Sequence, residues 1–315
     1  MSISAWYPYR SAEVRDSVLG FYDSLAARVW PVASEERMVP TSQGRTFVRI
    51  SGPTGAPPLV LLHGAGATSL MWSPNIKALS EECRTVAVDQ IGEIGRSTCT
   101  APPQTLDDLV AWLNELFDAL ELPDGINLAG MSYGGALTAQ YALRFPKRLN
   151  KAVLLAPANT VLRLRAEAIV RLALCVIARK SGVPALVHWM FADLARKDPA
   201  RLDSIIEELL IVMQSLERRK VPIPPVLTDA EWAGLAVPTL FLVGAHETIY
   251  SPDKAVRRLK RVAPQVRTEI IPGAGHDLTL AQAETVNRTI LEFLRPKAAE
   301  AFHAAPDLRL SQLPR

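Results

Sequence analysis

The sequence is poor in cysteine and has no strong charge bias. Its three cysteines, Cys83, Cys99 and Cys175, are an odd number without the spacing of metal ligands. They argue against a disulfide framework and a zinc site, and they fit a reducing cytoplasm. The formal net charge is only +3, and acidic and basic residues are mixed along the chain, which indicates neither a nucleic-acid-binding surface nor a polybasic membrane anchor. We therefore expect a small-molecule partner, no metal and no cofactor, and we leave a homodimer open.

The sequence also lacks a long uninterrupted apolar run. The uncharged stretch 126–143 is broken by glycines and polar residues, unlike a membrane span. Near the N-terminus, Arg10, Glu13, Arg15 and Asp16 stand where a signal peptide needs apolar residues. These absences predict a cytoplasmic protein without membrane insertion.

What the sequence does contain is an alternation of strand and helix patterns. Six short apolar runs have the length of buried strands: residues 59–62, 85–88, 126–129, 152–155, 239–243 and 268–271. Helical patterns between most of them predict a mostly parallel sheet covered by helices on both faces. Residues 36–39 and 46–50 flank a turn and predict an antiparallel hairpin at the edge of the sheet.

Two helix starts carry local signals. Thr105 and Asp108 have the spacing of a capping box before a helix that begins at about Leu106. Ser73 followed by Pro74 predicts an N-cap with proline at the first helical position.

The 315 residues predict one large α/β domain with an insertion. We assign its core to residues 36–158 and 226–295. A mildly amphipathic segment predicts a helix in an N-terminal extension, residues 1–35. Residues 159–225 are helical throughout and predict a cap over the carboxyl edge of the sheet, whereas residues 296–315 predict a frayed tail.

Within the predicted cap, Ile169, Leu172 and Val176 share one side of a helix. The arginines of this segment are Arg163, Arg165, Arg171 and Arg179. They could contact an anionic substrate, but charged residues that flank an apolar stripe usually form a solvated face, and we favour that interpretation.

One glycine-rich turn, Gly130-Met131-Ser132-Tyr133-Gly134-Gly135, lies between a predicted strand and a predicted helix. A serine presented at such a sharp turn needs small residues two positions before and after it, here Gly130 and Gly134. The following helix directs the positive end of its dipole to the place where an oxyanion forms. The turn predicts acyl transfer with Ser132 as nucleophile, although a G-x-S-x-G string also arises by chance.

A serine nucleophile needs a base, for which the chain offers five histidines. His276 lies in a glycine-rich loop after the last predicted strand, from which it can reach Ser132, and it is the predicted base. The other histidines follow a strand, adjoin the candidate acid, or lie in the cap and the tail: His63, His246, His188 and His303. We interpret the first two as loop residues.

Glu247, four residues past the strand 239–243, is the candidate acid. Asp253 is its rival, but it follows Ser251-Pro252 and better fits the first turn of a helix. Ser132, Glu247 and His276 then stand in the chain order serine, acid, histidine.

These features resemble those of an α/β-hydrolase-fold serine hydrolase of the esterase-like kind with a helical cap, over residues 36–295. Besides the elbow at Ser132, the resemblance rests on residues 63–66, 89–97 and 273–276. It implies an oxyanion hole made of the backbone N–H groups of Ala65 and Tyr133. Glu247 stands where many relatives carry Asp, so its extra methylene requires a different loop path.

The sequence thus predicts a serine hydrolase that cleaves carboxylic esters through an acyl-enzyme. We expect small to medium hydrophobic esters, contacted by Gly64, Gly66, Trp189 and Met190, although the cap residues could instead close the cap's own core. A lactonase, a C–C bond hydrolase or a peptidase would use the same triad, and a non-catalytic receptor on this fold stays open. A dehalogenase or epoxide hydrolase is disfavoured because those relatives carry a carboxylate nucleophile where this chain has Ser132.

Overall fold

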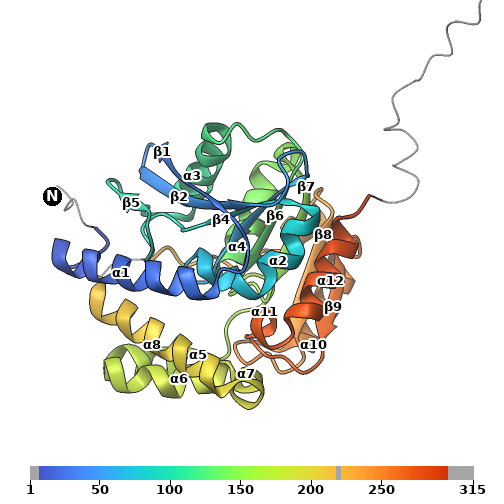
Figure 1. The fold of residues 1–315 in the computed structure, drawn as a ribbon. Coiled ribbons are helices and arrows are strands. Elements are labelled where there is room, and N and C mark those ends of the chain that lie inside the picture. Colours follow the sequence, from blue (N-terminus) through green and yellow to red (C-terminus); the bar gives the residue numbers. More distant parts are fainter. Residues whose placement is uncertain (1–6, 218–220, 297–315) are drawn as a thin grey trace, which may run out of the picture.

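The computed structural model describes residues 7–217 and 221–296, and within them the chain folds around one twisted sheet (Figure 1). The strands are β1 (Glu35–Thr41), β2 (Gly44–Ser51), β3 (Pro58–Leu62), β4 (Arg84–Val88), β5 (Thr98–Cys99), β6 (Ile126–Met131), β7 (Leu149–Leu155), β8 (Thr239–Gly244) and β9 (Arg267–Ile271). Their order is β1-β2-β4-β3-β6-β7-β8-β9, with β5 paired to β2. All pairs from β4 to β9 are parallel, and β2 is antiparallel to its neighbours, so the predicted fold class is confirmed.

Helices cover both faces of this sheet. Those of the core and the N-terminal extension are α1 (Ala12–Val29), α2 (Ser73–Glu82), α3 (Leu106–Ala119), α4 (Tyr133–Arg144), α9 (Asp229–Ala233), α10 (Pro252–Val262), α11 (Leu278–Ala281) and α12 (Ala283–Leu294). Four more form the cap: α5 (Ala166–Ala178), α6 (Gly182–Met190), α7 (Ala192–Lys197) and α8 (Pro199–Ser215). Among the described helices, none is both long enough and apolar enough to cross a membrane.

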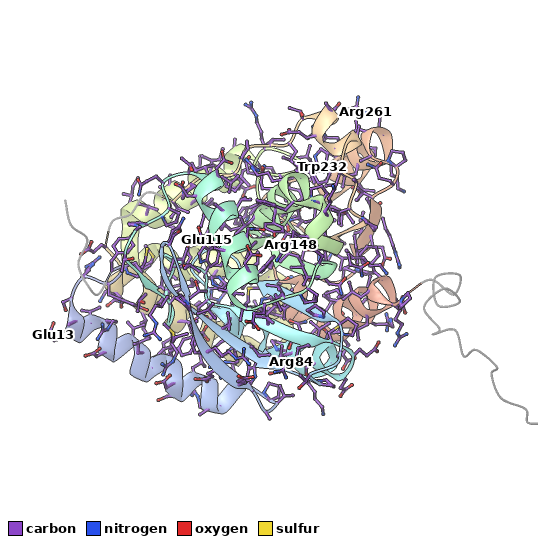
Figure 2. The ribbon with its side chains drawn as sticks, turned by 90° about the horizontal axis from the view of Figure 1, so that it is seen from above. Glu13, Arg84, Glu115, Arg148, Trp232 and Arg261 are labelled. Atoms are coloured by element: carbon purple, nitrogen blue, oxygen red, sulfur yellow. The ribbon has the colours of Figure 1, made fainter. Side chains whose placement is uncertain are left out.

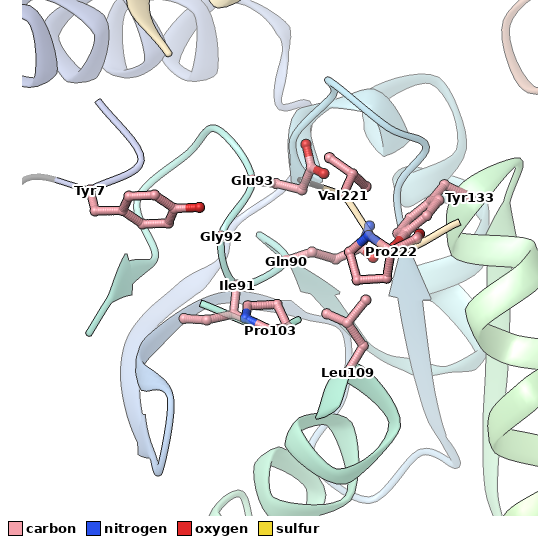
Figure 3. Close-up of a pocket in the computed structure, with 10 residues that line it drawn as sticks. All are labelled: Tyr7, Gln90, Ile91, Gly92, Glu93, Pro103, Leu109, Tyr133, Val221 and Pro222. Carbon is pink, nitrogen blue, oxygen red and sulfur yellow. The ribbon is translucent and has the colours of Figure 1, made fainter. Parts of the chain in front are cut away.

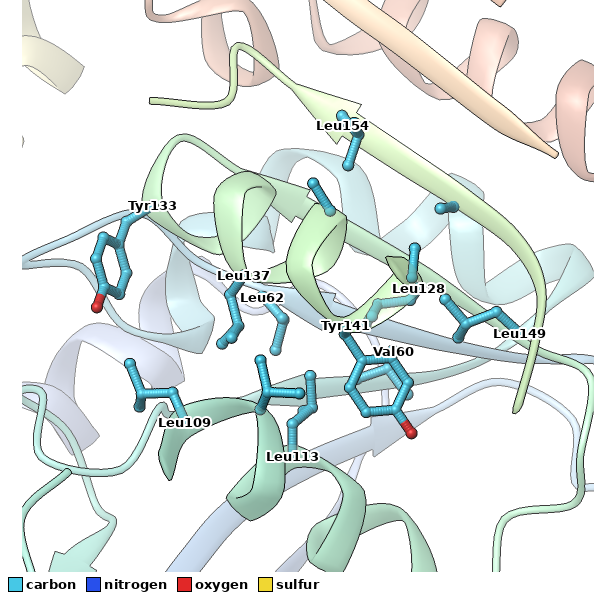
Figure 4. Packing of buried hydrophobic residues seen from close by; sticks show 14 of the residues in the cluster. Val60, Leu62, Leu109, Leu113, Leu128, Tyr133, Leu137, Tyr141, Leu149 and Leu154 are labelled. Carbon is cyan, nitrogen blue, oxygen red and sulfur yellow. The ribbon is translucent and has the colours of Figure 1, made fainter. Parts of the chain in front are cut away.

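The central strands are apolar without alternation because both of their faces are covered. Val60 and Leu62 of β3 belong to a cluster with Leu113 of α3, which Figure 4 shows beside α4. Leu61 points to the other face and packs in a cluster with Ile76 of α2. Burial of this kind contributes about 25 cal/mol per Å² of apolar surface to the stability of the sheet and its covering helices.

The edge hairpin of the sheet forms as predicted, with Thr41 opposite Gly44 in the register of β1 and β2. Glu115 of α3, labelled in Figure 2, lies beside this turn. Its carboxylate accepts hydrogen bonds from the N–H and the hydroxyl of Ser42, at 2.8 and 2.9 Å, and so connects the turn to the core. Arg148, before β7, forms ion pairs with carboxylates at the end of α3 and in the next loop. The hairpin is tied to α3 through Glu115, and the segment before β7 is tied to α3 through Arg148.

The two local helix signals had different outcomes. The Thr105 hydroxyl accepts from the N–H of Asp108 at 3.1 Å and the Asp108 carboxylate accepts from the N–H of Thr105 at 2.9 Å, which confirms the capping box. The prediction of Ser73 as an N-cap is wrong. A 3-10 turn, Ser69–Trp72, runs directly into α2, so that Trp72 stands at the N-cap and Ser73 is already helical.

The cap lies at the carboxyl end of the parallel strands, and α1 runs along both the core and α8 (Figure 1). Ile169, Leu172 and Val176 do share one side of α5, but all three are exposed. The helix instead buries its smaller residues Ala168 and Cys175. Residues 1–6, 218–220 and 297–315, which include His303 and nearly all of the expected tail, lie outside the described residues.

Candidate active site

Ser132 stands alone between β6, which ends at Met131, and α4, which begins at Tyr133. Its φ of 53° and ψ of −112° are unusual for a residue with a side chain, and such conformations cost about 1–3 kcal/mol. The surroundings hold it there: its N–H donates to the carbonyl of Leu155 at 2.8 Å, and its own carbonyl accepts from Ala136 and Ala158. The hydroxyl is therefore presented at the N-terminus of α4, where the helix dipole favours negative charge.

The two glycines that flank Ser132 are required by close approach of the backbone. A Cβ at Gly130 would lie 2.2 Å from the carbonyl oxygen of Gly134, and a Cβ at Gly134 would lie 2.5 Å from that of Leu62. No side-chain movement can relieve a clash with backbone atoms. The sequence spacing thus has the steric cause that we inferred for it.

His276 and Glu247 complete a continuous chain of hydrogen bonds with Ser132. The Nε2 atom of His276 lies 3.0 Å from the Oγ of Ser132, and Nδ1 lies 2.9 Å from the Oε2 of Glu247. The second oxygen of Glu247 accepts from the N–H of Ile249 at 2.9 Å. The side chains of His276 and Glu247 are buried. Their polar atoms therefore depend on these hydrogen bonds, because burial removes them from water.

The carboxylate of Glu247 affects the pKa of His276. Burial alone would lower the pKa of His276, but the neighbouring carboxylate and its hydrogen bond outweigh burial and raise that pKa above its ordinary value. A base with a raised pKa is a stronger proton acceptor, which suits the removal of a proton from a serine hydroxyl.

Asp253, the rival acid, lies away from this chain of contacts. It is exposed in the first turn of α10, where the Ser251 hydroxyl accepts from the N–H of Lys254 at the helix N-cap. Glu247 instead follows a tight turn after β8, in which its N–H donates to the carbonyl of Gly244 at 3.2 Å. The turn directs the carboxylate of Glu247 to the Nδ1 of His276.

The loop after β3 runs directly against Ser132. A Cβ at Gly64 would lie 3.4 Å from the Cβ of Ser132, and Ala65 and Tyr133 lie with Ser132 in the wall of one cavity. The N–H of Gly66 donates to the buried carboxylate of Glu93 at 3.2 Å. Glu93 was missed as a supporting residue, although it lies inside the segment 89–97 on which the resemblance rests.

A cavity of about 350 Å³ opens in front of Ser132 and His276, between the sheet and the cap. Its wall is mostly apolar and includes Gly64, Ala65, Gly66, Met131, Tyr133, Leu164, Leu172, Leu186, Val187, Met190, Phe191, Ile205 and Leu209. Three of the four expected substrate contacts, Gly64, Gly66 and Met190, thus lie in the wall. Trp189 is not among the described residues that line it, and its ring packs under the guanidinium of Arg171 at 4.9 Å.

An ion pair interrupts the apolar wall of this cavity, to which Asp277 also contributes. Arg201 and Glu208 of α8 form an ion pair at 3.3 Å, and both are partly buried. Burial raises the pKa of Glu208, and the charge of Arg201 offsets part of that effect. The pair gives the cavity one polar region away from its aliphatic surface.

The cap is bonded to the loops that carry His276 and Glu247. Asp277, next to His276, accepts from the N–H of Leu194 at 2.7 Å and from that of Gly275 at 2.8 Å. Asp193 of α7 lies 2.9 Å from the Nδ1 of His246, next to Glu247. Sequence reasoning missed both aspartates because their partners lie far away along the chain.

The other histidines that the structure describes lie outside the hydrogen-bonded series of Ser132, His276 and Glu247. The ring of His63 accepts at Nε2 from the N–H of Gln90 at 3.0 Å and shapes the loop between β3 and α2. His188 is exposed on α6, where its Nδ1 lies 2.9 Å from the carbonyl of Pro184. The roles expected for His63 and His246 as loop residues agree with these contacts.

A second, much smaller cavity of about 20 Å³ lies on the other side of Tyr133, lined also by Tyr7, Glu93 and Pro222 (Figure 3). This volume is about that of a single water site. The Tyr133 hydroxyl donates to the carbonyl of Pro222 at 2.8 Å, so its ring is fixed between the two cavities.

A family model described as alpha/beta hydrolase family matches residues 59–289, which is most of the chain. The chain belongs to this family. Over 283 residues this hydrolase is 35% identical to the carboxylesterase YbfK of Bacillus subtilis, covering 89% of this chain and 95% of the relative. The crystal structure of naproxen esterase (carboxylesterase NP) from the same organism superposes with a TM-score of 0.83 at 32% identity, covering 91% of this chain and all of that one. The crystal structure of carboxylesterase CesB (YbfK) gives a TM-score of 0.80 at 33% identity.

Proposed function

We propose that this hydrolase is a serine carboxylesterase whose triad is Ser132, His276 and Glu247. The observation that carries the proposal is the continuous hydrogen-bonded chain from Ser132 Oγ through His276 to Glu247, which opens into an apolar cavity. The likeness to carboxylesterases over nearly the whole chain supports the same activity. No metal or cofactor takes part in the steps below.

In the first step, Ser132 Oγ attacks the ester carbonyl while its proton moves to the Nε2 of His276. The Nδ1–H of His276 donates to Glu247, which holds the tautomer and stabilises the imidazolium. The N–H groups of Ala65 and Tyr133 donate hydrogen bonds to the negatively charged oxygen of the tetrahedral intermediate. His276 then returns the proton to the departing alcohol, and water releases the acid by the same steps in reverse order.

The cavity supports a substrate of small to medium size with hydrophobic groups. Its 350 Å³ lies at the lower end of the range for small-molecule sites, and its wall is mostly aliphatic. Gly64, Gly66 and Met190 are proposed to contact the ester, and Trp189 is proposed to act only through the packing of the cap. We propose a cytoplasmic location because the three cysteines are free thiols in the described structure.

A panel of substrates tests this function. Purified protein is assayed with aromatic and aliphatic esters, with lactones and with aminoacyl amides at equal concentrations. Preferential turnover of esters is the expected result. Faster turnover of lactones or amides would replace the proposed activity with a lactonase or a peptidase, and tight binding without turnover would indicate a receptor.

A further inference from the structure

The outer side of α5 carries an apolar patch. Among the described residues, eight large apolar side chains are more than a third exposed, and six of them lie on this helix of 13 residues. The six side chains, which are 37–76% exposed, are Ile169, Val170, Leu172, Leu174, Val176 and Ile177. So many exposed apolar side chains on one helix mark an interaction surface rather than ordinary scatter.

The patch covers the side of α5 that faces away from the protein. With 100° between successive residues, Ala168 and Cys175 lie on one side and the six apolar residues span the rest. Arg171 is half-buried, forms an ion pair with Glu167 at 2.9 Å and stacks on Trp189. From Leu172 to the end of the helix no residue is charged.

Basic residues stand at both ends of the patch. Arg163 and Arg165 precede α5 and Lys180 follows it, and all three side chains are exposed. The segment 161–191 contains five basic residues and one acidic residue, Glu167, a net charge of +4 against +3 for the whole chain. The positive excess of the chain therefore lies on α5 and the residues that flank it.

We propose that α5 docks this protein on an anionic lipid surface, with its patch at the acyl boundary and the flanking basic side chains among the head groups. One residue joins the patch to the catalytic cavity, because Leu172 is both exposed on α5 and part of the cavity wall. Docking would place the cap side of the cavity against the lipid. An ester dissolved in the membrane would then meet the cavity without crossing water.

A second copy of this chain fits the patch less well. A helix of 13 residues is about 20 Å long, so its exposed face offers only a few hundred Å², whereas a stable dimer buries roughly 800 Å² on each partner. Two such helices packed together would also bring their basic ends near one another. The charge and the area both favour the lipid surface.

The test uses sedimentation with vesicles of ether-linked lipids, which contain no carboxylic ester for the enzyme to consume. Vesicles of phosphatidylcholine are compared with vesicles that also contain phosphatidylglycerol. We expect binding that increases with the anionic lipid and decreases as salt is added. Ile177→Glu should weaken the binding by about tenfold or more, because it places a charge in the patch.

Ile223→Glu is the matched control, because Ile223 is 81% exposed outside α5 and Ile177 is 76% exposed within it. The control should bind vesicles like the wild type, and both variants should hydrolyse a water-soluble ester at the wild-type rate. Equal binding by wild type and Ile177→Glu would overturn the proposal, as would a wild-type dimer that Ile177→Glu dissociates without any vesicle binding. Vesicle binding by a protein that cleaves no ester would contradict the proposed function alone, and ester cleavage without vesicle binding would contradict docking alone.

Discussion

The elbow helix α4 and the cap helix α5 are similar in length and differ in almost every packing property. Ten of the twelve residues of α4 are buried, and its first turn is set by backbone contacts with Gly130 and Leu62. On α5 only Ala168 and Cys175 are buried. The core helix is therefore held by close contacts with the backbone, whereas the cap helix exposes most of its side chains. Substitutions in the two regions should differ in the same way: those at the triad should abolish the chemistry, and those in the cap should change which molecules reach it.

The largest effect is expected for Ser132→Ala. Removing the nucleophile should lower kcat for an ester by roughly 10⁶-fold, the scale seen when a triad nucleophile is lost. Labelling by an organophosphonate, read by mass spectrometry, should disappear. The melting temperature should stay unchanged or rise, because Ala tolerates the backbone conformation at this φ as well as Ser does. A variant that is still labelled stably would show that the nucleophile lies elsewhere.

Next in size is Glu247→Gln. The amide keeps the shape of the side chain but can favour the wrong imidazole tautomer of His276, and kcat should decrease by roughly 10⁴-fold. Asp253→Asn is the control, since that carboxylate lies exposed at a helix terminus where it contributes about 1 kcal/mol or less. Melting temperatures of both variants separate structural from catalytic loss. Our assignment of the acid fails if Asp253→Asn is the inactive protein.

The dependence of kcat/KM on pH sharpens the role of the core further. His276 must be neutral to accept a proton, and its pKa is raised by Glu247, so the rate should fall about tenfold per pH unit below that raised pKa. In Glu247→Gln the carboxylate charge is gone, and the residual activity should persist to lower pH. A profile that is flat from pH 5 to 8, or one that does not move in the variant, would contradict this account.

The core and the triad geometry were accessible from sequence because local rules and tertiary packing agree there. The glycines around Ser132 report a close backbone approach, and the apolar runs report strands covered on both faces. The short β5 and α9 were not predicted, since two and five residues carry too little periodicity. Ser73 was assigned wrongly because a preceding 3-10 turn leaves no signal of its own.

The contacts around the triad that sequence could not supply are those between distant segments. Asp277 is bonded to Leu194 and Asp193 to His246 across 83 and 53 residues of chain, and no local pattern predicts either pairing. The cap helix α5 is also an exception to the rule that an apolar stripe points inward, because it buries small residues and exposes large ones. Whole-chain charge was equally uninformative, since it does not show that the positive excess lies in the cap.

The smallest effect is expected in the cap, where Met190 and Trp189 form an adjacent pair with different surroundings. Met190 lines the cavity, so Met190→Ala should enlarge it and change the ratio of kcat/KM between a bulky and a short ester by less than about tenfold, with kcat for the short ester preserved. Both side chains pack against the main apolar cluster, but Trp189 lies under Arg171 and is not among the described residues that line the cavity. Trp189→Ala should therefore lower the melting temperature and leave the ratio between the two esters unchanged. The ester ratio and the melting temperature of both variants show whether each residue contacts the substrate or stabilises the cap. If Trp189→Ala shifts the ester ratio more than Met190→Ala, then the substrate reaches beyond the cavity to Trp189. In that case the part of α6 that selects the substrate is larger than the cavity wall alone.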